Sequence, residues 1–588
     1  MEIERIFDLI AYTKEKYGED HKVFGSKKDK KWATVSAKEY GEMADAVSKA
    51  FMEAGYGKGD KVIIISSSRP EWNISDMGVL QFGGVSIPIY PTISEKEYEY
   101  IFRHSDAKAV IVENSHLFNK IKDTADKIES IERVITIDKV DEEHTTIGEM
   151  IESGMKSQKD EELSNAKKSI SGKDLATFIY TSGTTGLPKG VMLSHSNFVN
   201  QLLNLKDIPD KRVKKALSFL PLCHVYERMM VYLYQYIGAT TYYAENMATI
   251  MDNLKEVNPQ MMTCVPRLLE KIQEKLIGAD KNLKGLDKKI YYWAVNVAKS
   301  YDLDKQTAAY KIKHKIADTL IYKKWRAALG GDFDIVVSGG SSINPVLTNF
   351  FNAMGWPIFE GYGMSETSPV IAVSEKWPMA RKAGSVGPAL PGVQIKISPE
   401  NNEICCKGHN VMMGYYKDPE KTKEVIDSDG WFHTGDTGRF DKHKRLYITG
   451  RIKSLFKTSM GKYINPEVLE QKYCESPLID QMMVVGENQK FAAALVVPNF
   501  DNLREAAKAQ GLEAGTNIQM ANNTKITRLV AEDMKKFDSN FGDWERIKKI
   551  KLISDEWSQE SGIITPTLKL RRNVILERYA NEIEQLFE

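Results

Sequence analysis

Cysteine is scarce in this sequence, and its few residues form no recognisable metal-binding or disulfide pattern. The five cysteines are odd in number, and no two of them form a CxxC pair. Disulfide-rich secreted domains carry an even set of cysteines, and zinc sites use closely spaced pairs. We therefore expect a protein of a reducing compartment without a zinc site.

A long hydrophobic run is also missing. The longest uncharged stretch, residues 229–244, is shorter than the roughly 18 apolar residues that suggest a membrane span, and it contains Gln, Gly, Thr and Tyr. We expect it to form a buried helix and strand. The first residues, Met-Glu-Ile-Glu-Arg, lack the apolar core of a secretory signal. A cytoplasmic location is expected, with peripheral attachment to the inner face of a membrane as the alternative.

An excess of one charge is absent as well. The chain has 81 basic and 80 acidic residues, so its formal net charge of +1 gives no sign of a nucleic-acid partner. Its 588 residues exceed what one core can organise, and two or more domains are expected. With 42% hydrophobic and 27% charged residues, the composition is that of a soluble globular protein. The sequence predicts no oligomeric state.

Strand and helix patterns alternate in the first third of the chain. Apolar, β-branched runs at 61–66, 84–90, 107–113 and 133–138 predict strands, and helical patterns separate them. Parallel strands joined by crossover helices form α/β sheets with helices on both faces. We therefore predict a doubly wound α/β fold for the large N-terminal part.

The most informative stretch is 175–190, where a predicted buried strand runs into a glycine-rich loop. Thr181 to Gly190 holds three glycines, four hydroxyl groups and Lys189. Glycines let a backbone approach a ligand closely, and N–H groups, hydroxyls and a lysine can bind phosphate oxygens. Pro188 precedes the lysine, so the loop is not a Walker motif. A mobile linker is the alternative, but linkers seldom follow a buried strand so abruptly.

This loop resembles the signature of the adenylate-forming superfamily, the AMP-dependent synthetases and ligases. The resemblance implies that the loop closes over the β- and γ-phosphates of ATP. It also implies that Thr185 takes part in catalysis and that Thr181, together with Glu366, binds Mg²⁺. The residues that it assigns to ATP binding in the loop are Thr181, Ser182, Gly183, Thr184, Gly186 and Lys189.

Two further strand ends carry glycine-rich turns, which suits a flat nucleotide. Strands predicted at 334–338 and 357–360 lead into Gly-Gly-Ser and Gly-Tyr-Gly. By resemblance, the first turn lines the adenine, Tyr362 stacks on it, Thr367 contacts the α-phosphate and Glu366 holds Mg²⁺. The turn residues assigned to the nucleotide are Gly339, Gly340, Ser341, Gly361, Tyr362 and Gly363.

The family resemblance continues to the end of the chain through a predicted β-rich subdomain and a small α+β domain. It implies that Asp436 and Arg451 hold the ribose. It divides the chain into 1–451, the large ATP- and acyl-binding domain, and 452–588, a small mobile domain with its hinge at Lys453. Gly461 then belongs to a loop that approaches CoA.

Near the C-terminus, Lys569 matches the family's mobile catalytic lysine. Ser454 and Leu568 depart from residues that many relatives carry beside the hinge and this lysine. Long-chain members often carry Thr-Pro-Thr-x-Lys around this lysine, so Leu568 fits that branch.

One segment points to the substrate. His224 in Leu-Pro-Leu-Cys-His resembles the long-chain acyl-CoA synthetase branch, where this histidine lies beside the carboxylate and acyl pocket. A core histidine is the alternative, and we interpret His195 in that structural way. The lysine-rich segment 271–326 is expected to be helical and solvated, with a patch for the CoA 3′-phosphate or an anionic membrane as the alternative.

Together these motifs predict ATP-dependent activation of a long-chain fatty acid to acyl-AMP and then to acyl-CoA. The substrates implied are a fatty acid, ATP and CoA, with Mg²⁺ as the metal. An acyl-AMP ligase that serves a carrier protein, and a CoA ligase for a medium-chain or aromatic acid, are the alternatives. A regulator with an inactive site is disfavoured because the set Thr185, Glu366, Asp436, Arg451 and Lys569 is intact.

Overall fold

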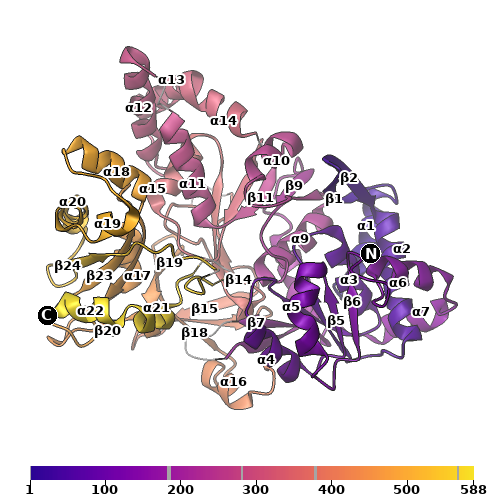
Figure 1. The fold of residues 1–588 in the computed structure, drawn as a ribbon. Coiled ribbons are helices and arrows are strands. Elements are labelled where there is room, and N and C mark those ends of the chain that lie inside the picture. The colour runs from indigo at the N-terminus through magenta and orange to yellow at the C-terminus, as the bar shows by residue number, and fades with distance from the viewer. Residues whose placement is uncertain are drawn as a thin grey trace.

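The computed structural model describes residues 2–181, 187–279, 283–330, 332–376, 380–559, 561–565 and 569–588, with only the backbone of Lys453. Two large sheets and a smaller antiparallel sheet make up most of the chain, and the C-terminal elements lie to one side of them (Figure 1). The predicted α/β class is confirmed.

The first large sheet confirms the predicted βαβ arrangement. β7, β4, β3, β5 and β6 are parallel, whereas β8 pairs with β7 in the antiparallel sense. In sheet order its strands are β17 (Gly414–Tyr415), β8 (Lys189–Ser194), β7 (Leu175–Thr181), β4 (Val85–Ile89), β3 (Lys61–Ile65), β5 (Ala109–Val112) and β6 (Arg133–Thr136).

The second large sheet brings together strands from the middle of the chain and one N-terminal hairpin. β12 and β13 are parallel neighbours, so the two glycine-rich turns predicted from the sequence leave one sheet edge side by side. Its strands are, in order, β14 (Val370–Val373), β13 (Ile358–Gly363), β12 (Ile335–Ser338), β11 (Met261–Cys264), β9 (Lys215–Ser218), β10 (Thr240–Tyr243), β1 (Lys22–Lys28) and β2 (Lys31–Ser36).

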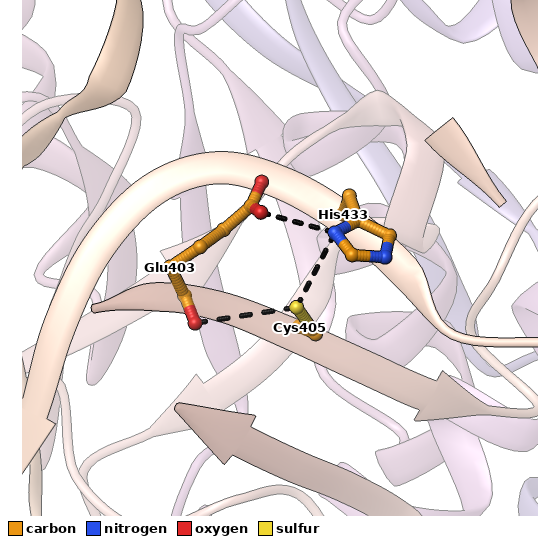
Figure 2. A group of neighbouring side chains, drawn as sticks. All are labelled: Glu403, Cys405 and His433. Atoms are coloured by element: carbon orange, nitrogen blue, oxygen red, sulfur yellow. Dashed lines mark hydrogen bonds and ion pairs between the residues drawn. The ribbon is translucent and has the colours of Figure 1, made fainter. Parts of the chain in front are cut away.

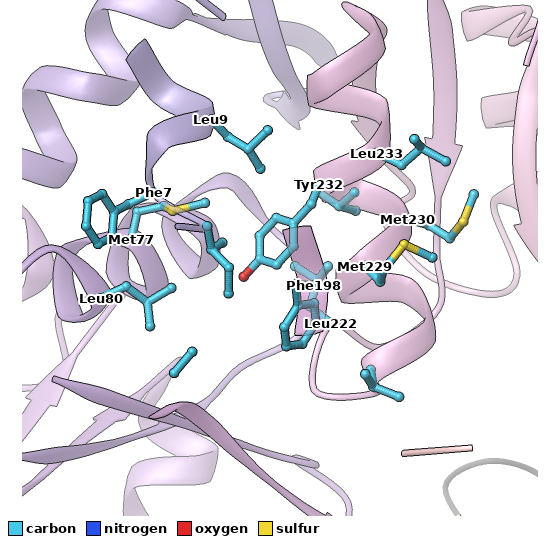
Figure 3. Close-up of a cluster of buried hydrophobic side chains, with 14 of the residues drawn as sticks. Phe7, Leu9, Met77, Leu80, Phe198, Leu222, Met229, Met230, Tyr232 and Leu233 are labelled. Carbon is cyan, nitrogen blue, oxygen red and sulfur yellow. The ribbon is translucent and has the colours of Figure 1, made fainter. Parts of the chain in front are cut away.

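Helices cover the sheets and fill the space between them. Tyr232 of α9 points toward the N-terminal helices and lies between Leu9 and Phe198, whereas Met230 and Leu233 lie on the other side of the helix (Figure 3). The helices up to the middle of the chain are α1 (Asp8–Tyr17), α2 (Ala37–Glu53), α3 (Pro70–Gln81), α4 (Glu95–Ser105), α5 (Ser115–Ala125), α6 (Ile147–Lys156), α7 (Asp160–Ser169), α8 (His195–Leu205), α9 (Val225–Ile237), α10 (Ile250–Val257) and α11 (Pro266–Ile277).

A helical excursion follows α11 and projects beyond the sheets (Figure 1). It confirms the helical prediction for 271–326 and contains α12 (Gly285–Lys299), α13 (Ala308–Ala317), the π-helical turn η2 (Asp318–Tyr322) and α14 (Lys323–Leu329). The chain then returns to the second sheet, where α15 (Pro345–Ala353) begins at a proline. In the part of the chain that the structure describes, no helix combines the length and the apolar character of a bilayer span.

The remaining elements form the predicted β-rich subdomain and the α+β C-terminal unit. The subdomain sheet consists of β15 (Val393–Ile397), β16 (Glu403–Gly408), β18 (Phe432–Phe440) and β19 (Leu446–Arg451). The C-terminal unit contains β20 (Phe456–Lys457), β21 (Tyr463–Ile464), the antiparallel pair β22 (Ile479–Val485) and β23 (Ala493–Pro498), and β24 (Lys549–Leu552). Helices in these two parts are α16 (Pro419–Val425), α17 (Pro466–Tyr473), α18 (Phe500–Ala509), α19 (Asn517–Ala521), α20 (Thr524–Met534), α21 (Arg572–Arg578) and α22 (Ala580–Phe587).

One local expectation was wrong. The sequence after the phosphate loop suggests that 191–193 extends the turn, but these residues belong to β8, which pairs directly with β7. The polar, lysine-rich segment 151–173, which the sequence suggests as an exposed approach to the key strand, is largely exposed and contains the end of α6 and all of α7. The sequence offers Ser194 or Ser196 as the cap of the next helix, and the structure has Ser194 in that place, since its hydroxyl accepts from the backbone N–H of Asn197.

Candidate active site

A buried carboxylate on β18 lies at the centre of the candidate site. Asp436 is only 3% exposed, and its Oδ2 accepts a hydrogen bond of 2.8 Å from the hydroxyl of Tyr362. Its Oδ1 lies 2.8 Å from Nε of Arg451, the last residue of the neighbouring strand β19. The structure thus brings three predicted site residues together from β13, β18 and β19.

Electrostatics favour the charged form of this arginine. Burial raises the pKa of Asp436, while Arg451 and the Tyr362 hydroxyl oppose the rise. The negative charge of Asp436 raises the pKa of Arg451 against the effect of burial. The pair therefore presents a fixed, oriented carboxylate, which suits an acceptor for neighbouring hydroxyl groups.

A second hydrogen-bonded group holds the turn before Asp436. Glu403 accepts from the backbone N–H of Gly435 at 2.9 Å, and its other oxygen lies 3.0 Å from Nδ1 of His433 (Figure 2). Cys405 Sγ lies 3.6 Å from the same nitrogen. Burial raises the pKa of the Cys405 thiol to about 11, so the thiol is protonated at neutral pH. We interpret this trio as a positioning cluster for Asp436.

The glycine-rich strand ends are shaped by close backbone packing. A Cβ on Gly363 would lie 1.7 Å from the backbone oxygen of Pro369, so only glycine fits there. Gly340 adopts a φ of +82°, and a Cβ on Gly339 would press on the ring of Tyr226 at 3.2 Å. Ser341 follows these glycines as an exposed residue.

Glu366 lies beside the hairpin that flanks the phosphate loop. Its Oε1 accepts a hydrogen bond of 2.9 Å from the hydroxyl of Tyr415, a residue of β17. Lys189 Nζ lies 5.2 Å from the centre of the same tyrosine ring, and Lys189 pairs with Thr181 across β7 and β8. Tyr415 therefore links the predicted Mg²⁺ carboxylate to the predicted phosphate lysine. The remaining loop predictions lie outside the described residues: Ser182, Gly183, Thr184, Thr185 and Gly186.

Carboxylate and hydroxyl oxygens are the ligands that Mg²⁺ prefers, so Glu366 and Thr181 fit this ion chemically. Among the described residues, one group of three or more metal-capable side chains is close enough to share an ion, and it is the positioning cluster rather than this pair. Thr367 is fully buried, and its hydroxyl donates to the backbone oxygen of Pro369 at 2.7 Å. A contact of that hydroxyl with the α-phosphate would require the side chain to turn.

An apolar pocket opens beside the glycine-rich strand ends. Its empty volume, including the solvent-open part, is about 690 Å³, within the usual range of small-molecule sites. Gly339, Gly340, Gly361, Tyr362 and Gly363 line one side. The apolar wall includes Leu205, Ile208, Met230, Leu233, Val337 and Phe359.

His224 belongs to the wall of this pocket. It caps α9, and its Nδ1 accepts a 3.1 Å hydrogen bond from the backbone N–H of Tyr226. Burial lowers the pKa of His224 to about 4, and the charge of Lys569 adds to the effect. The ring is therefore neutral at pH 7 and carries its hydrogen on Nε2, which makes it a donor.

His195, by contrast, is structural as predicted. It is 1% exposed, stacks edge-on against Phe7, and accepts from the backbone N–H of Ile6 at 3.3 Å. Burial lowers its pKa to about 3.

Lys569 reaches the site from the C-terminal unit. The residue as a whole is exposed, whereas its ammonium group lies among protein groups. Its pKa is lowered first by this removal from bulk water and then by Arg451, while Asp436 and Glu366 oppose the decrease. The charge of Lys569 also lowers the pKa of His224, so this lysine acts electrostatically on both the Asp436–Arg451 pair and the pocket histidine.

Polar contacts dock the C-terminal unit in this position. Arg571 donates to Glu97 at 3.3 Å, and Asn344 donates to Glu475 at 2.7 Å. Gly461, with a φ of +79°, lies in the turn between β20 and β21 and is exposed rather than part of the pocket. The side chain of Lys453 lies outside the described atoms.

Sequence reasoning missed two tyrosines that shape the site. Tyr226 lines the pocket, and its hydroxyl donates to the backbone oxygen of Val337 at 3.0 Å. The only sequence signal for Tyr226 was its position two residues after His224. Tyr415 was missed because its contact with Glu366 depends on the pairing of β17 with β8.

Comparison with known proteins agrees with this geometry. The model of the AMP-binding enzyme family matches residues 11–416, and that of the AMP-binding enzyme C-terminal domain matches residues 454–588. Fatty acyl-CoA synthetase A of Dictyostelium discoideum is 31% identical over 96% of this chain and 87% of its own length. Long-chain-fatty-acid–CoA ligase 1 of Homo sapiens is 30% identical over 96% and 84%.

A solved structure shares the whole fold at lower identity. The adenylation domain of a carboxylate reductase from Mycobacterium chelonae superposes with a TM-score of 0.79, at 20% identity, over 99% of this chain and 91% of that one.

Proposed function

The chain belongs to the AMP-binding enzyme family, and we propose that it converts a long-chain fatty acid, ATP and CoA into acyl-CoA, AMP and pyrophosphate. The observation that carries this function is the apolar pocket, which is bounded by His224 and the glycine-rich turns and lies within reach of the Lys569 charge. The long-chain ligases among its relatives support the choice of substrate.

In the first step, the fatty carboxylate attacks the α-phosphate of ATP, an acyl–phosphate bond forms and pyrophosphate leaves. The carboxylate is ionised at neutral pH, so no protein base is required. We assign to His224 Nε2–H the task of orienting the carboxylate, and to Lys569 that of neutralising charge at the α-phosphate. Asp436 and Arg451 hold the ribose.

Glu366 and Thr181 would hold Mg²⁺, which supplies positive charge to the phosphates. Lys189 and the preceding loop, Ser182 to Gly186 with Thr185, are proposed to bind the β- and γ-phosphates, as the family resemblance implies. Gly339 to Ser341 and Gly361 to Gly363 would enclose the adenine.

In the second step, the CoA thiol attacks the acyl carbonyl carbon, a thioester forms and AMP leaves. We propose that residues 452–588 turn about Lys453 between the two steps, which would withdraw Lys569 and bring the Gly461 turn to the site. The positive φ of Gly461 allows the backbone to pass close to a ligand.

The test is AMP formation by the purified protein with ATP and Mg²⁺ across acids from acetate to oleate, each with and without CoA. CoA-dependent AMP formation with a maximum at long chains is expected. Pyrophosphate release without a thioester would favour a ligase that serves a carrier protein. A maximum at short or aromatic acids would retain the chemistry but contradict the assignment of the pocket.

We also propose that the protein meets membranes at their surface, since long-chain fatty acids partition into lipid bilayers. The lysine-rich helices after α11 fit such a contact. Binding of the CoA 3′-phosphate would instead require these helices to lie beside the pocket.

A further inference from the structure

Strand pairing in the subdomain sheet gathers three side chains that can bind a metal ion. Glu403 and Cys405 are two residues apart on β16, and both face His433 of β18, the cross-strand neighbour of Cys405 (Figure 2). In the part of the chain that the structure describes, this set of three has ligand atoms that all lie within 4.8 Å of one another. No spacing in the sequence indicates the set, because His433 follows Cys405 by 28 positions.

The distances within the set are close to those of a tetrahedral zinc site. Cys405 Sγ lies 3.6 Å and Glu403 Oε2 lies 3.0 Å from Nδ1 of His433. Zn–S bonds of about 2.3 Å and Zn–N or Zn–O bonds of about 2.0 Å, at tetrahedral angles, separate sulfur from nitrogen by about 3.5 Å and oxygen from nitrogen by about 3.3 Å. An ion can therefore enter between the three atoms after small side-chain movements.

A further carboxylate orients the histidine from its other side. Nε2 of His433 lies 3.5 Å from Oδ2 of Asp427. Oδ1 of Asp427 accepts from the backbone N–H groups of Asp429 and Trp431, which fixes the carboxylate. A metal-binding histidine usually donates its second ring hydrogen to a carboxylate, and this leaves the ligand nitrogen free to bind the ion. Asp427 is placed for that role, with Nδ1 facing the two other ligands.

The set is covered on the protein side and open beside the histidine. Cys405 is fully buried, whereas the side chains of Glu403 and His433 are 12% and 35% exposed. An ion can therefore reach the thiol from solvent along the imidazole ring. Three protein ligands also leave a fourth position, which water occupies in zinc sites with this number of protein ligands.

We propose that Glu403, Cys405 and His433 bind one Zn²⁺ ion, with water as the fourth ligand. Thiolate, imidazole and carboxylate are the donors that zinc uses, whereas Mg²⁺ prefers oxygen alone. On binding, the Cys405 thiol releases its proton to solvent and the Sγ–Zn bond forms. The inference departs from the expectation of a chain without a zinc site, which was based on the absence of a CxxC pair.

The site goes beyond the proposed reaction but has a consequence for it. Glu403 also accepts from the backbone N–H of Gly435 at 2.9 Å, directly before Asp436. An ion on Glu403 would act on the turn that holds this carboxylate, so KM for ATP should differ between the zinc-loaded and the metal-stripped protein. This consequence rests on the proposed contact of Asp436 with the ribose, whereas the binding of zinc does not.

The experiment is titration of the full chain, stripped of metal and kept reduced, with Co²⁺ as a spectroscopic substitute for Zn²⁺. A thiolate bound to Co²⁺ gives charge-transfer absorption in the near ultraviolet, and Co²⁺ at the oxygens of Glu366 and Thr181 gives none. We expect this absorption to saturate at one thiolate-bound ion per chain and to disappear when Zn²⁺ is added. Cys405→Ser should abolish it.

Cys406 provides a matched control for Cys405. It is the next residue of β16, pairs with Phe432 and packs into the apolar core, so Cys406→Ser should retain the absorption. Melting temperatures of both variants distinguish the loss of a ligand from the loss of the fold.

Asp427→Asn tests the site without touching a ligand. Its amide oxygen can keep the backbone contacts of Oδ1, while its NH₂ group would donate to Nε2 of His433 and so place the ring hydrogen on Nδ1. We expect the affinity for Zn²⁺ to fall about 10- to 100-fold.

Three results would overturn the inference: no thiolate absorption from the unaltered protein, equal absorption by Cys405→Ser, or an unchanged affinity for Zn²⁺ in Asp427→Asn. The last result decides the matter even if Cys405→Ser fails to fold. Metal binding needs neither ATP nor a fatty acid, so an inactive protein that still binds Zn²⁺ would refute only the proposed reaction.

Discussion

Replacing Asp436 by Asn is the most direct test of the ribose assignment. The two carboxylate oxygens of Asp436 accept from the Tyr362 hydroxyl and from Arg451 Nε, both at 2.8 Å. Asn has nearly the same shape but offers one acceptor oxygen and no charge. The substitution therefore removes the charge opposite Arg451 and the charge-assisted bonds to a ribose, without opening a cavity.

The size of the effect follows from those lost bonds. Hydrogen bonds to a charged group are worth about 1.5–3 kcal/mol, which corresponds to an increase of about 10- to 150-fold in KM for ATP. Tyr362→Phe keeps the ring and the Arg451 contact, so about 1 kcal/mol, or roughly fivefold, is expected. The Arg451 side chain is 38% exposed, and water can solvate it when its partner loses charge. The substitution Asp436→Asn should therefore lower the free energy of unfolding by only about 1 kcal/mol.

The assay is pyrophosphate release at varied ATP with saturating fatty acid, alongside thermal melting of each variant. A rise in KM for ATP with a nearly unchanged melting temperature supports the assignment. A KM for ATP within twofold of the unaltered protein would refute it. A large fall in melting temperature with unchanged KM would instead mark the Asp436–Arg451 pair as structural.

The remaining predictions concern other parts of the site and core. Lys569→Ala should abolish adenylation but spare thioester formation from supplied acyl-AMP, and an equal loss of both half-reactions would contradict its assignment. His224→Phe should raise KM for the fatty acid about tenfold or more through one lost bond to a carboxylate, and an unchanged KM would remove His224 from substrate binding. Gly363→Ala should lower the melting temperature and abolish activity because its Cβ meets a backbone oxygen, whereas Gly361→Ala, with 3.9 Å of space, should fold. The folded-state pKa of His195, about 3, lies below its unfolded value, so stability is lost as pH falls from about 6.5. This loss reaches about 1.4 kcal/mol at about pH 5.5, and His195→Gln should reduce the acid shift in melting temperature.

Sequence alone was enough for elements whose pattern is local. The strands now seen as β3, β4 and β5 are apolar runs between polar turns, and each was predicted close to its observed bounds. β8 was missed because Gly190 interrupts a short run that begins with a lysine, and glycine weakens a strand signal. α7 was missed because Leu163 is its single buried residue, which leaves almost no periodicity to detect.

The site shows the same division between local and distant information. Motifs identified Tyr362 and Asp436 separately, but they are 74 positions apart, and their hydrogen bond follows from the docking of the subdomain onto β13. The Tyr415 contact with Glu366 likewise depends on strand pairing between β17 and β8. No spacing in the sequence encodes either contact.

The location of Lys569 depends on more than strand pairing, because it is set by the orientation of the whole C-terminal unit. Among the residues that the structure describes, the buried clusters of that unit share no member with those before Arg451, so the unit has its own core. Its docking contacts, such as Arg571 with Glu97, are polar and partly exposed. Contacts of this kind contribute little net free energy each, and water can replace them. An interface built in this way favours one orientation without locking it, which is the property that the proposed role of Lys569 in only one of the two steps requires.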